Sequence, residues 1–276
     1  MPSAPGEPPI SSDVPFDVIG DPATTRLVLL HGFTQNRRCW GPVPALLARN
    51  REVVVADAPG HGDAAALRLS LADAADPYAS ALAEGRRAQW LGYSMGGRLA
   101  LHVALARPDA VGALVLVGTS PGIDDPAARA ERRADDEALA AHLERVGTAR
   151  FVDEWLDQPL FAGLDDASSH RREREANDPA GLASSLRLAG TGAQASLWGA
   201  LGSITAPVLL VVGARDAKFR SVAEAMAPRF GGPCSVAVLP DTGHACHLEA
   251  PEAFCAVVGA WLDDVEPDAS AQAGTP

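Results

Sequence analysis

The pentapeptide GYSMG at residues 92–96 places a serine in the Gly-x-Ser-x-Gly pattern of a sharp turn that presents a nucleophile. An apolar run precedes this turn, and the helix-forming run RLALHVALARP follows it. Gly92 and Gly96 have no side chain to obstruct a tight backbone turn. We therefore predict that Ser94 stands at a strand-to-helix turn, with its hydroxyl above a sheet.

A serine hydroxyl is a poor nucleophile or base until another group takes its proton, and in this type of turn an acid and then a histidine follow the serine along the chain. Asp216 follows the apolar run VLLVVG, and His244 follows the apolar run SVAVLP. Parallel sheets place their functional side chains after the ends of such strands. The sequence therefore predicts Ser94, Asp216 and His244 as a catalytic triad.

Two other residues compete for these roles. His247 lies three residues after His244 and is the rival base. Asp57 ends another apolar run, but it precedes the serine in the chain, so it is the weaker candidate for the acid. Its expected role is to bond turn amides.

The loop HGFTQN at residues 31–36 follows the first long apolar run and is suited to an oxyanion hole. The backbone amide of Phe33 can join that of Met95, which directly follows the serine. We predict that these two amides stabilise a negatively charged oxygen in the reaction.

Arg98 stands one helical turn after Ser94. An enzyme that hydrolyses apolar esters has no evident need of a cation at this position. The chain has a formal net charge of -12 at pH 7, which argues against a nucleic-acid or anionic-membrane partner because most of the surface would repel it. An anionic ligand must therefore meet a local basic pocket, and Arg98 is the first candidate for it.

The elements that must position these residues are short apolar runs that alternate with helical segments. Continuous apolar runs suit strands covered on both faces, so the pattern predicts a mainly parallel sheet flanked by helices, an α/β fold. The predicted strands are residues 26–31, 52–57, 88–93, 113–118, 208–213 and 235–240.

The alternation stops between about residues 122 and 203, where charged and Ala-rich helical stretches contain no convincing strand. We expect a helical cap, residues 122–203, inserted between two parts of one core, residues 1–121 and 204–276. The first dozen residues and the C-terminal tail after Val265 have little to bury and are expected to be disordered.

The remaining sequence features predict a cytoplasmic protein. No apolar run approaches the roughly 20 residues of a membrane helix, and the N-terminal residues have neither a basic nor an apolar leader region, so a cytoplasmic location without membrane insertion is expected. The four cysteines show no Cys-x-x-Cys spacing, which indicates neither a zinc site nor a redox motif. The sequence leaves the oligomeric state open, as a monomer or small homo-oligomer.

The motifs HGF, DAPGHG, GYSMGG, GARD and GH together resemble the α/β-hydrolase superfamily, from Phe16 to Trp261. Arg98 and the inserted segment resemble a narrower family, the 2-succinyl-6-hydroxy-2,4-cyclohexadiene-1-carboxylate synthases of menaquinone biosynthesis. This resemblance implies an α/β-hydrolase fold with an inserted helical cap. It also implies substrate-binding roles for Tyr93, Arg98, Arg133, Trp155 and Arg174, with Arg132 and Arg172 as alternatives within the cap.

The resemblance implies a lyase. The family's substrate, 2-succinyl-5-enolpyruvyl-6-hydroxy-3-cyclohexene-1-carboxylate, is a small tricarboxylate that loses pyruvate. Several arginines suit such a ligand, since a guanidinium pairs with a carboxylate through two parallel hydrogen bonds. The implied mechanism uses Ser94 as a base and needs neither a metal nor a cofactor.

Two other functions stay open at this point. A serine carboxylesterase or C–C bond hydrolase of the same fold would use the same triad but would not need the cap arginines. A ligand receptor that keeps the fold without turnover would have no need of a complete triad.

Overall fold

The computed structural model of the chain describes residues 14–265, and its centre is a seven-stranded sheet. The strands lie in the order β1-β3-β2-β4-β5-β6-β7. β1 runs antiparallel to β3, whereas every other pair is parallel. The strands are β1 (Phe16–Ile19), β2 (Arg26–Leu30), β3 (Glu52–Ala56), β4 (Ala88–Tyr93), β5 (Val111–Val117), β6 (Val208–Gly213) and β7 (Cys234–Leu239).

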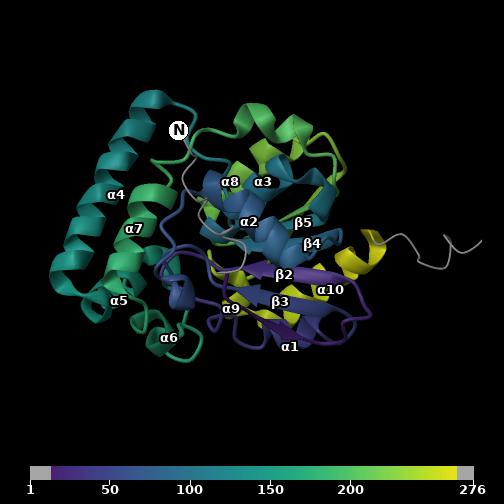
Figure 1. Cartoon of the computed structure of the whole chain (residues 1–276), viewed down its shortest axis with the longest axis horizontal. Coiled ribbons are helices and arrows are strands. Elements are labelled where there is room, and N and C mark those ends of the chain that lie inside the picture. The colour runs from purple at the N-terminus through teal and green to yellow at the C-terminus, as the bar shows by residue number, and fades with distance from the viewer. Residues whose placement is uncertain (1–13, 266–276) are drawn as a thin grey trace, which may run out of the picture.

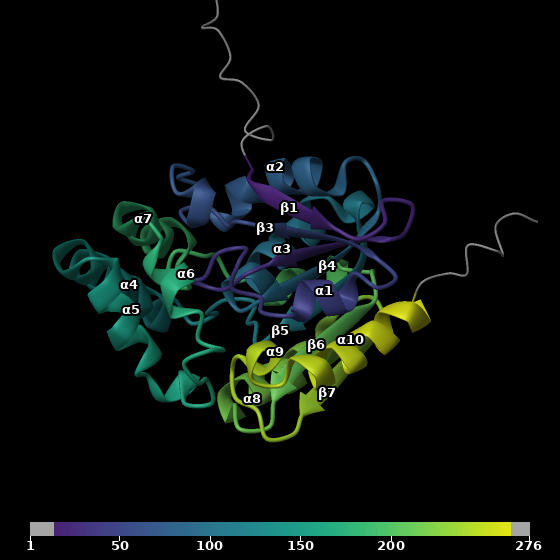
Figure 2. The same cartoon turned by 90° about the horizontal axis from the view of Figure 1, so that it is seen from below.

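Helices cover both faces of this sheet, as Figures 1 and 2 show. One apolar layer packs the sheet against α2 (Leu71–Ala83), α3 (Met95–Ala106) and α8 (Ala217–Met226). The other packs it against α1 (Val43–Leu47), α9 (Cys246–Glu249) and α10 (Pro251–Val265). Burial on both faces explains why β2, β3, β4 and β6 are apolar without alternation.

The chain between β5 and β6 forms helices that lie to one side of the sheet in Figure 1, and we call α4 to α7 the cap helices. Their own small apolar cluster includes Leu143, Phe151 and Leu182. α4 and α7 pack side by side, which buries the apolar stripe of each helix. The cap helices are α4 (Pro126–Val146), α5 (Thr148–Leu156), α6 (Arg171–Glu175) and α7 (Pro179–Ala189).

The predicted α/β class, a mainly parallel sheet flanked by helices, is confirmed, and all six predicted strands are present to within about two residues. The short antiparallel strand β1 was missed because it is only four residues long and largely exposed, so it has no apolar run. The cap boundaries at residues 122 and 203 stay a prediction. The expected disorder of both chain ends concerns residues outside the described range.

No helix among the described residues is long and apolar enough to cross a membrane.

Candidate active site

Ser94 occupies a strained turn between β4 and α3. Its backbone has φ 51° and ψ -107°, in the positive-φ region that side chains other than glycine rarely adopt. A Cβ at position 96 would lie 1.9 Å from the carbonyl oxygen of Leu30, and one at position 92 would lie 2.4 Å from the carbonyl oxygen of Gly96. Glycine is therefore required on both sides of the serine, which explains the pattern in the sequence.

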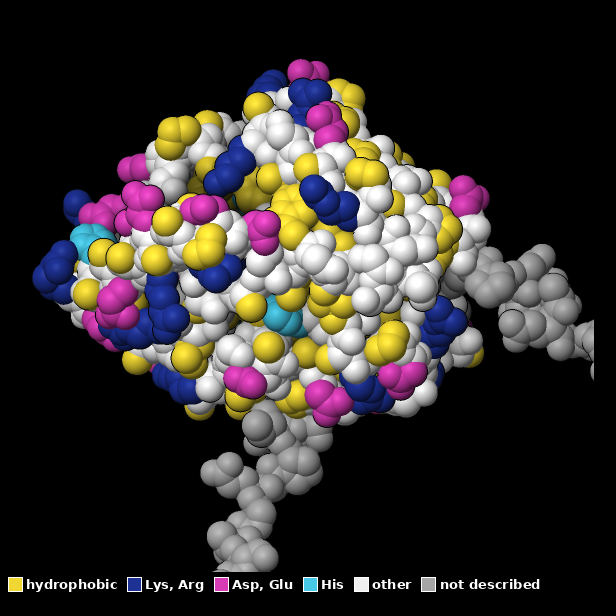
Figure 3. Space-filling view, turned by 90° about the horizontal axis from the view of Figure 1, so that it is seen from above, with side chains coloured by type: hydrophobic (Ala, Val, Ile, Leu, Met, Phe, Trp, Pro, Cys, Tyr) yellow, Lys and Arg dark blue, Asp and Glu magenta, His cyan; other side chains and the backbone are white. Residues whose placement is uncertain are grey.

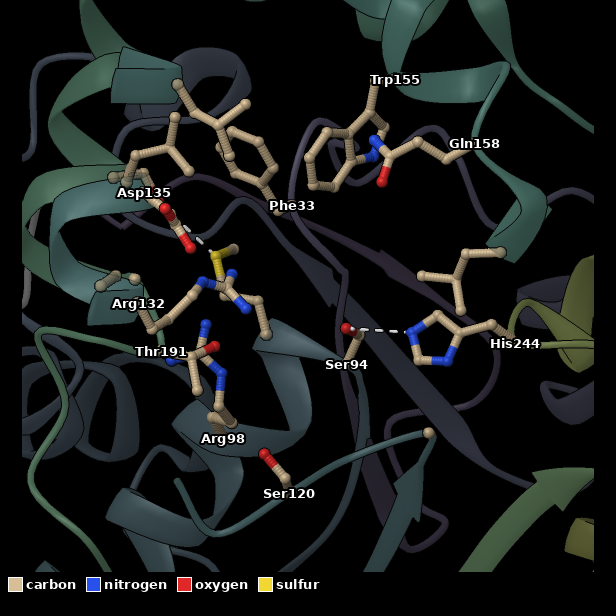
Figure 4. A pocket seen from close by; sticks show the side chains of 18 of the residues that line it. Phe33, Ser94, Arg98, Ser120, Arg132, Asp135, Trp155, Gln158, Thr191 and His244 are labelled. Carbon is tan, nitrogen blue, oxygen red and sulfur yellow. Dashed lines mark hydrogen bonds between the residues drawn. The ribbon is translucent and has the colours of Figure 1, made fainter. Parts of the chain in front are cut away.

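The three residues predicted as a triad meet in space. His244 Nε2 lies 3.3 Å from Ser94 Oγ, the contact drawn as a dashed line between these residues in Figure 4. His244 Nδ1 lies 2.7 Å from Asp216 Oδ2. Both Asp216 and His244 are buried. A carboxylate at Nδ1 makes that nitrogen the donor, which leaves Nε2 free to accept the serine proton.

The loop that carries Asp216 is fixed by the start of α8. Asp216 caps this helix: its Oδ1 accepts a hydrogen bond from the backbone N–H of Phe219 at 3.2 Å. Its other carboxylate oxygen is the one that faces His244. The ring of Phe219 packs against the ring of His244, with centroids 4.5 Å apart. The helix start therefore holds both the acid and the histidine.

The two competing residues lie elsewhere. His247 is fully buried against the rings of Tyr93 and Trp40, and neither of its ring nitrogens has a hydrogen-bond partner among the described residues. Burial and the nearby charge of His244 lower its pKa. Asp57 accepts hydrogen bonds from the backbone amides of Arg37 and Asp63 and pairs with the Arg37 guanidinium, so it bonds turn amides as expected.

A cavity of about 380 Å³ opens between the core and the cap helices beside Ser94 and His244. Phe33 and Met95, whose amides are the predicted oxyanion hole, both lie on its wall. The cap contributes further wall residues, among them Thr191, which follows α7, and Gln158, which follows α5 (Figure 4). The cavity therefore joins the serine and histidine to a surface supplied by the cap.

Arg98 lines this cavity as a buried cation. It is 8% exposed, and its Nη1 donates a hydrogen bond to Gln194 Oε1 at 3.0 Å. Burial and then the charge of Arg132 lower its pKa to about 10, against an opposing effect of Asp136. No carboxylate forms an ion pair with Arg98 among the described residues. Its charge is therefore available to an anion that enters the cavity.

The cap arginine on the cavity wall is Arg132 and not Arg133. Arg132 lines the cavity, and its Nε donates to Asp136 Oδ1 at 2.8 Å, one turn along α4. Arg133 is exposed and absent from the wall, since neighbouring helical residues point about 100° apart. This geometry favours Arg132, the alternative that the sequence left open, and the substrate contact of either arginine stays a prediction.

Trp155 lies on the cavity wall, as its implied role in substrate binding requires. Its ring packs edge-on against the ring of Phe33, with centroids 5.2 Å apart (Figure 4). It also stacks on Phe151 of the same helix. Trp155 therefore connects the cap to the loop of the predicted oxyanion hole.

Tyr93 and Arg174 do not line the cavity, and their implied contact with the substrate stays a prediction. Tyr93 is buried behind His244, with ring centroids 5.3 Å apart. Arg174 is 1% exposed and donates hydrogen bonds to the Ser169 carbonyl and the Thr34 hydroxyl. Burial lowers its pKa. The alternative, Arg172, is exposed and also lies off the wall.

Several wall residues carry chemistry that the sequence interpretation missed, namely Ser120, Asp135, Gln158, Thr191 and Lys218. Lys218 stands in the stretch RDAKF and Gln194, the partner of Arg98, in GTGAQASLW. Both stretches also resemble the synthase family, and this further resemblance was the available signal for these two positions.

The surface gives no broad anion-binding patch on the face seen in Figure 3, where basic and acidic side chains are interspersed over the cap side. Within residues 14–265, no cluster of three or more His, Cys, Asp or Glu side chains is arranged to hold a metal ion. Attraction for an anion must therefore come from cations inside the cavity.

Comparisons with known proteins find similar sequences and a similar fold. A family model described as "Alpha/beta hydrolase family" matches residues 27–257. A relative from Bacillus subtilis (strain 168), provisionally named a 2-succinyl-6-hydroxy-2,4-cyclohexadiene-1-carboxylate synthase, is 34% identical over 89% of this chain and 93% of its own length. A relative of that name from Salmonella newport (strain SL254) is 32% identical, over 84% of this chain and 91% of its own.

Among solved structures, MenH from S. aureus superposes with a TM-score of 0.81 and 30% sequence identity. The match covers 91% of this chain and 99% of the S. aureus chain. The similarity therefore includes the cap helices as well as the core.

Proposed function

The chain belongs to the α/β-hydrolase family and, within it, to the 2-succinyl-6-hydroxy-2,4-cyclohexadiene-1-carboxylate synthases, and on this premise we propose how its residues perform the family's reaction. The reaction is the elimination of pyruvate from 2-succinyl-5-enolpyruvyl-6-hydroxy-3-cyclohexene-1-carboxylate, a lyase step of menaquinone biosynthesis. Ser94, His244 and Asp216 act as the base, and arginines of the cavity bind the substrate.

One observation carries this proposal: a serine in contact with a histidine shares a cavity with two cations. Arg98 and Arg132 both line the cavity: Arg98 has no carboxylate partner among the described residues, whereas Arg132 pairs with Asp136 through its Nε. Each charge-assisted hydrogen bond to a carboxylate contributes about 1.5–3 kcal/mol, so two arginines favour a polyanion strongly over a neutral ester. A hydrolase of neutral esters has no use for this arrangement.

The first chemical step is removal of a ring proton. His244 Nε2 takes the Ser94 proton, while Asp216 holds the proton on His244 Nδ1 and stabilises the positive charge that forms. The Ser94 oxygen then removes the acidic hydrogen from ring carbon 2, next to the succinyl ketone. The electron pair of that C–H bond forms an enolate, whose oxygen the Phe33 and Met95 amides stabilise.

The second step is expulsion of the leaving group. The enolate electrons return through the ring double bond and break the C–O bond at ring carbon 5, which gives the cyclohexadiene. The enolpyruvyl group leaves as an enolate, takes up a proton and becomes pyruvate. Ser94 keeps the ring proton as its hydroxyl hydrogen, and His244 releases the proton it took from Ser94 to the departing pyruvate enolate. The triad thus returns to its starting state, and no covalent acyl-enzyme forms.

The experiment is to supply the tricarboxylate and follow pyruvate release with a coupled assay. The wild-type protein is expected to release one pyruvate per substrate. If the folded wild-type protein releases no pyruvate from the tricarboxylate, the proposed reaction is contradicted.

The alternative is a serine carboxylesterase or C–C bond hydrolase, which the contact between Ser94 and His244 would also serve. This alternative predicts rapid turnover of a small neutral aryl ester, with little loss when Arg98 becomes Ala. The synthase predicts the reverse, because Arg98→Ala removes a buried cation that only an anionic substrate needs. The two substrates tested on the one variant separate the two functions.

A cytoplasmic location and a state of monomer or small homo-oligomer stay predictions for this chain. Size-exclusion chromatography with light scattering measures the oligomeric state directly.

A further inference from the structure

The cavity has a third cation that the proposed mechanism does not use. Lys218 lies on the cavity wall together with Ser94, His244 and the two arginines. It is also the single lysine of the chain, in which all other residues that are permanently positive at neutral pH are arginines.

The local structure does not explain this lysine. Lys218 lies in the first turn of α8, where a positive charge faces the positive end of the helix dipole and weakens the helix. It makes no ion pair within residues 14–265, and its Nζ lies over the ring of Phe219, 5.7 Å from the ring centroid. Its neighbour Arg215, by contrast, lies 3.7 Å from Asp241. The charge of Lys218 therefore stands at the cavity without an ionic partner among the described residues.

Lys218 stands on the opposite side of the cavity from the arginines. Phe219, which it contacts, packs on the His244 ring, so the lysine is on the side of the histidine. Figure 4 shows Arg98 and Arg132 on the other side of Ser94. Asp135, an acidic residue of the wall, lies beside Arg132 in this view. The positive charges thus flank the reactive serine from two sides.

This arrangement matches the shape of the substrate in the proposed function, on which the inference rests. Carbons 2 and 5 of the ring are opposite corners, and each bears a substituent that ends in a carboxylate. A third carboxylate is attached to carbon 1. A ligand with charges at both ends of its ring is held best by cations at both ends of its cavity.

We propose that the Lys218 ammonium binds one substrate carboxylate on the His244 side of the cavity, opposite the arginines. Lysine suits this exposed position, because its flexible stem lets the compact charge follow the ligand as it enters and leaves. The contact exists in the ground state and in the transition state alike, so it acts on KM and leaves kcat nearly unchanged.

The test compares three variants in the pyruvate-release assay. Lys218→Gln is expected to raise KM about tenfold and to change kcat less than about threefold, which is the pattern of a lost uniform binding contact. Lys218→Arg is expected to recover most of the affinity. Arg215→Gln removes the same charge from the same loop, off the cavity wall, and is expected to keep the wild-type KM.

A chemical experiment avoids substitution altogether. Because the chain has one lysine, acetylation of the wild-type protein neutralises only Lys218 and the terminal amine. The acetylated wild type is expected to show the raised KM, and substrate present during the reaction is expected to slow acetylation of Lys218. The same treatment of Lys218→Gln reports the effect of the terminal amine alone.

The outcomes separate the two proposals. A wild-type protein that releases no pyruvate contradicts the proposed function. A wild-type protein that does release pyruvate, with Lys218→Gln at the wild-type KM, overturns the role of Lys218 alone. An equal rise in KM for Arg215→Gln also overturns the role of Lys218. The rise would then come from the loss of positive charge anywhere near the cavity, and not from a direct contact between Lys218 and the substrate.

Discussion

Arg98 is held in its cavity-facing position by a neutral side chain, since its Nη1 donates to Gln194 Oε1 at 3.0 Å. Both residues are buried, at 8% and 5% exposure. An aspartate or glutamate at position 194 would form an ion pair with the guanidinium and neutralise it for any ligand. The amide orients the cation and leaves its charge available.

The first prediction follows from this contact. Gln194→Glu keeps the size and shape of the side chain but adds a negative charge next to Arg98. We expect KM for the tricarboxylate to rise at least tenfold, because the substrate then competes with an internal carboxylate. Thermal unfolding shows whether the variant is folded. A wild-type KM in a folded Gln194→Glu protein contradicts the role of Gln194 in keeping Arg98 available.

The second prediction concerns the base. Ser94→Ala removes the oxygen that lies 3.3 Å from His244 Nε2 and leaves the cations of the cavity in place. We expect kcat for pyruvate release to fall by about 10²–10⁴-fold, the usual contribution of a positioned base. Substrate binding, measured by calorimetry, is expected to persist. Ser221→Ala, on the exposed surface of α8, is the control that should keep wild-type kcat.

The third prediction tests which cap arginine binds the substrate, Arg132 or Arg133. Arg132→Gln removes a cation from the cavity wall, whereas Arg133→Gln removes the adjacent, exposed cation from the same helix. We expect the first variant to raise KM about tenfold or more and the second to leave it within about twofold. Steady-state kinetics of both proteins in one buffer measure the difference. Equal effects of the two substitutions on KM would contradict the prediction that Arg132, and not Arg133, binds the substrate.

The core of the site was predictable because short-range rules determine it. Gly92 and Gly96 are required by backbone contacts as short as 1.9 Å, so the turn around Ser94 can be read from five letters. Asp216 and His244 each follow an apolar strand run, and parallel strands bring such loops to the same edge of the sheet.

The cap was less predictable, because the rotation of a helix decides which side chain enters the cavity. Arg132 and Arg133 are both plausible in an Ala- and Arg-rich helix, and a shift of one residue rotates the helix by about 100°. Arg174 is buried against Thr34, more than a hundred positions away in the chain, and no local pattern predicts that contact. The strand β1 was missed for the opposite reason, since its four residues bury too little to leave a pattern.

The last prediction is that stability falls on mild acidification, because histidines are buried in neutral form. His31 and His61 are fully buried, and their rings lie 5.1 Å apart. Burial lowers the pKa of His31 to about 4 and, with the added effect of the His31 charge, lowers that of His61 to about 3, from 6.5 in the unfolded chain. Between pH 6.5 and about 4 the unfolded chain therefore binds protons that the folded protein does not. Each histidine then lowers the free energy of unfolding by about 1.4 kcal/mol per pH unit as the pH falls through this range.

Urea unfolding at several pH values between 7 and 5 measures this slope. Protonation of Glu52 does not contribute in this pH range of 5 to 7. Hydrogen bonding to Arg26 holds the pKa of the Glu52 carboxyl below 4.5, so this group stays ionised. His61→Asn, which can keep a donor for the Pro59 carbonyl, is expected to reduce the slope by about 1 kcal/mol per pH unit. Because stability is present above pH 6.5 and lost toward pH 4, a wild-type protein that becomes more stable on acidification contradicts the prediction. A His61→Asn slope equal to that of the wild type shows instead that this histidine is not the source of the loss.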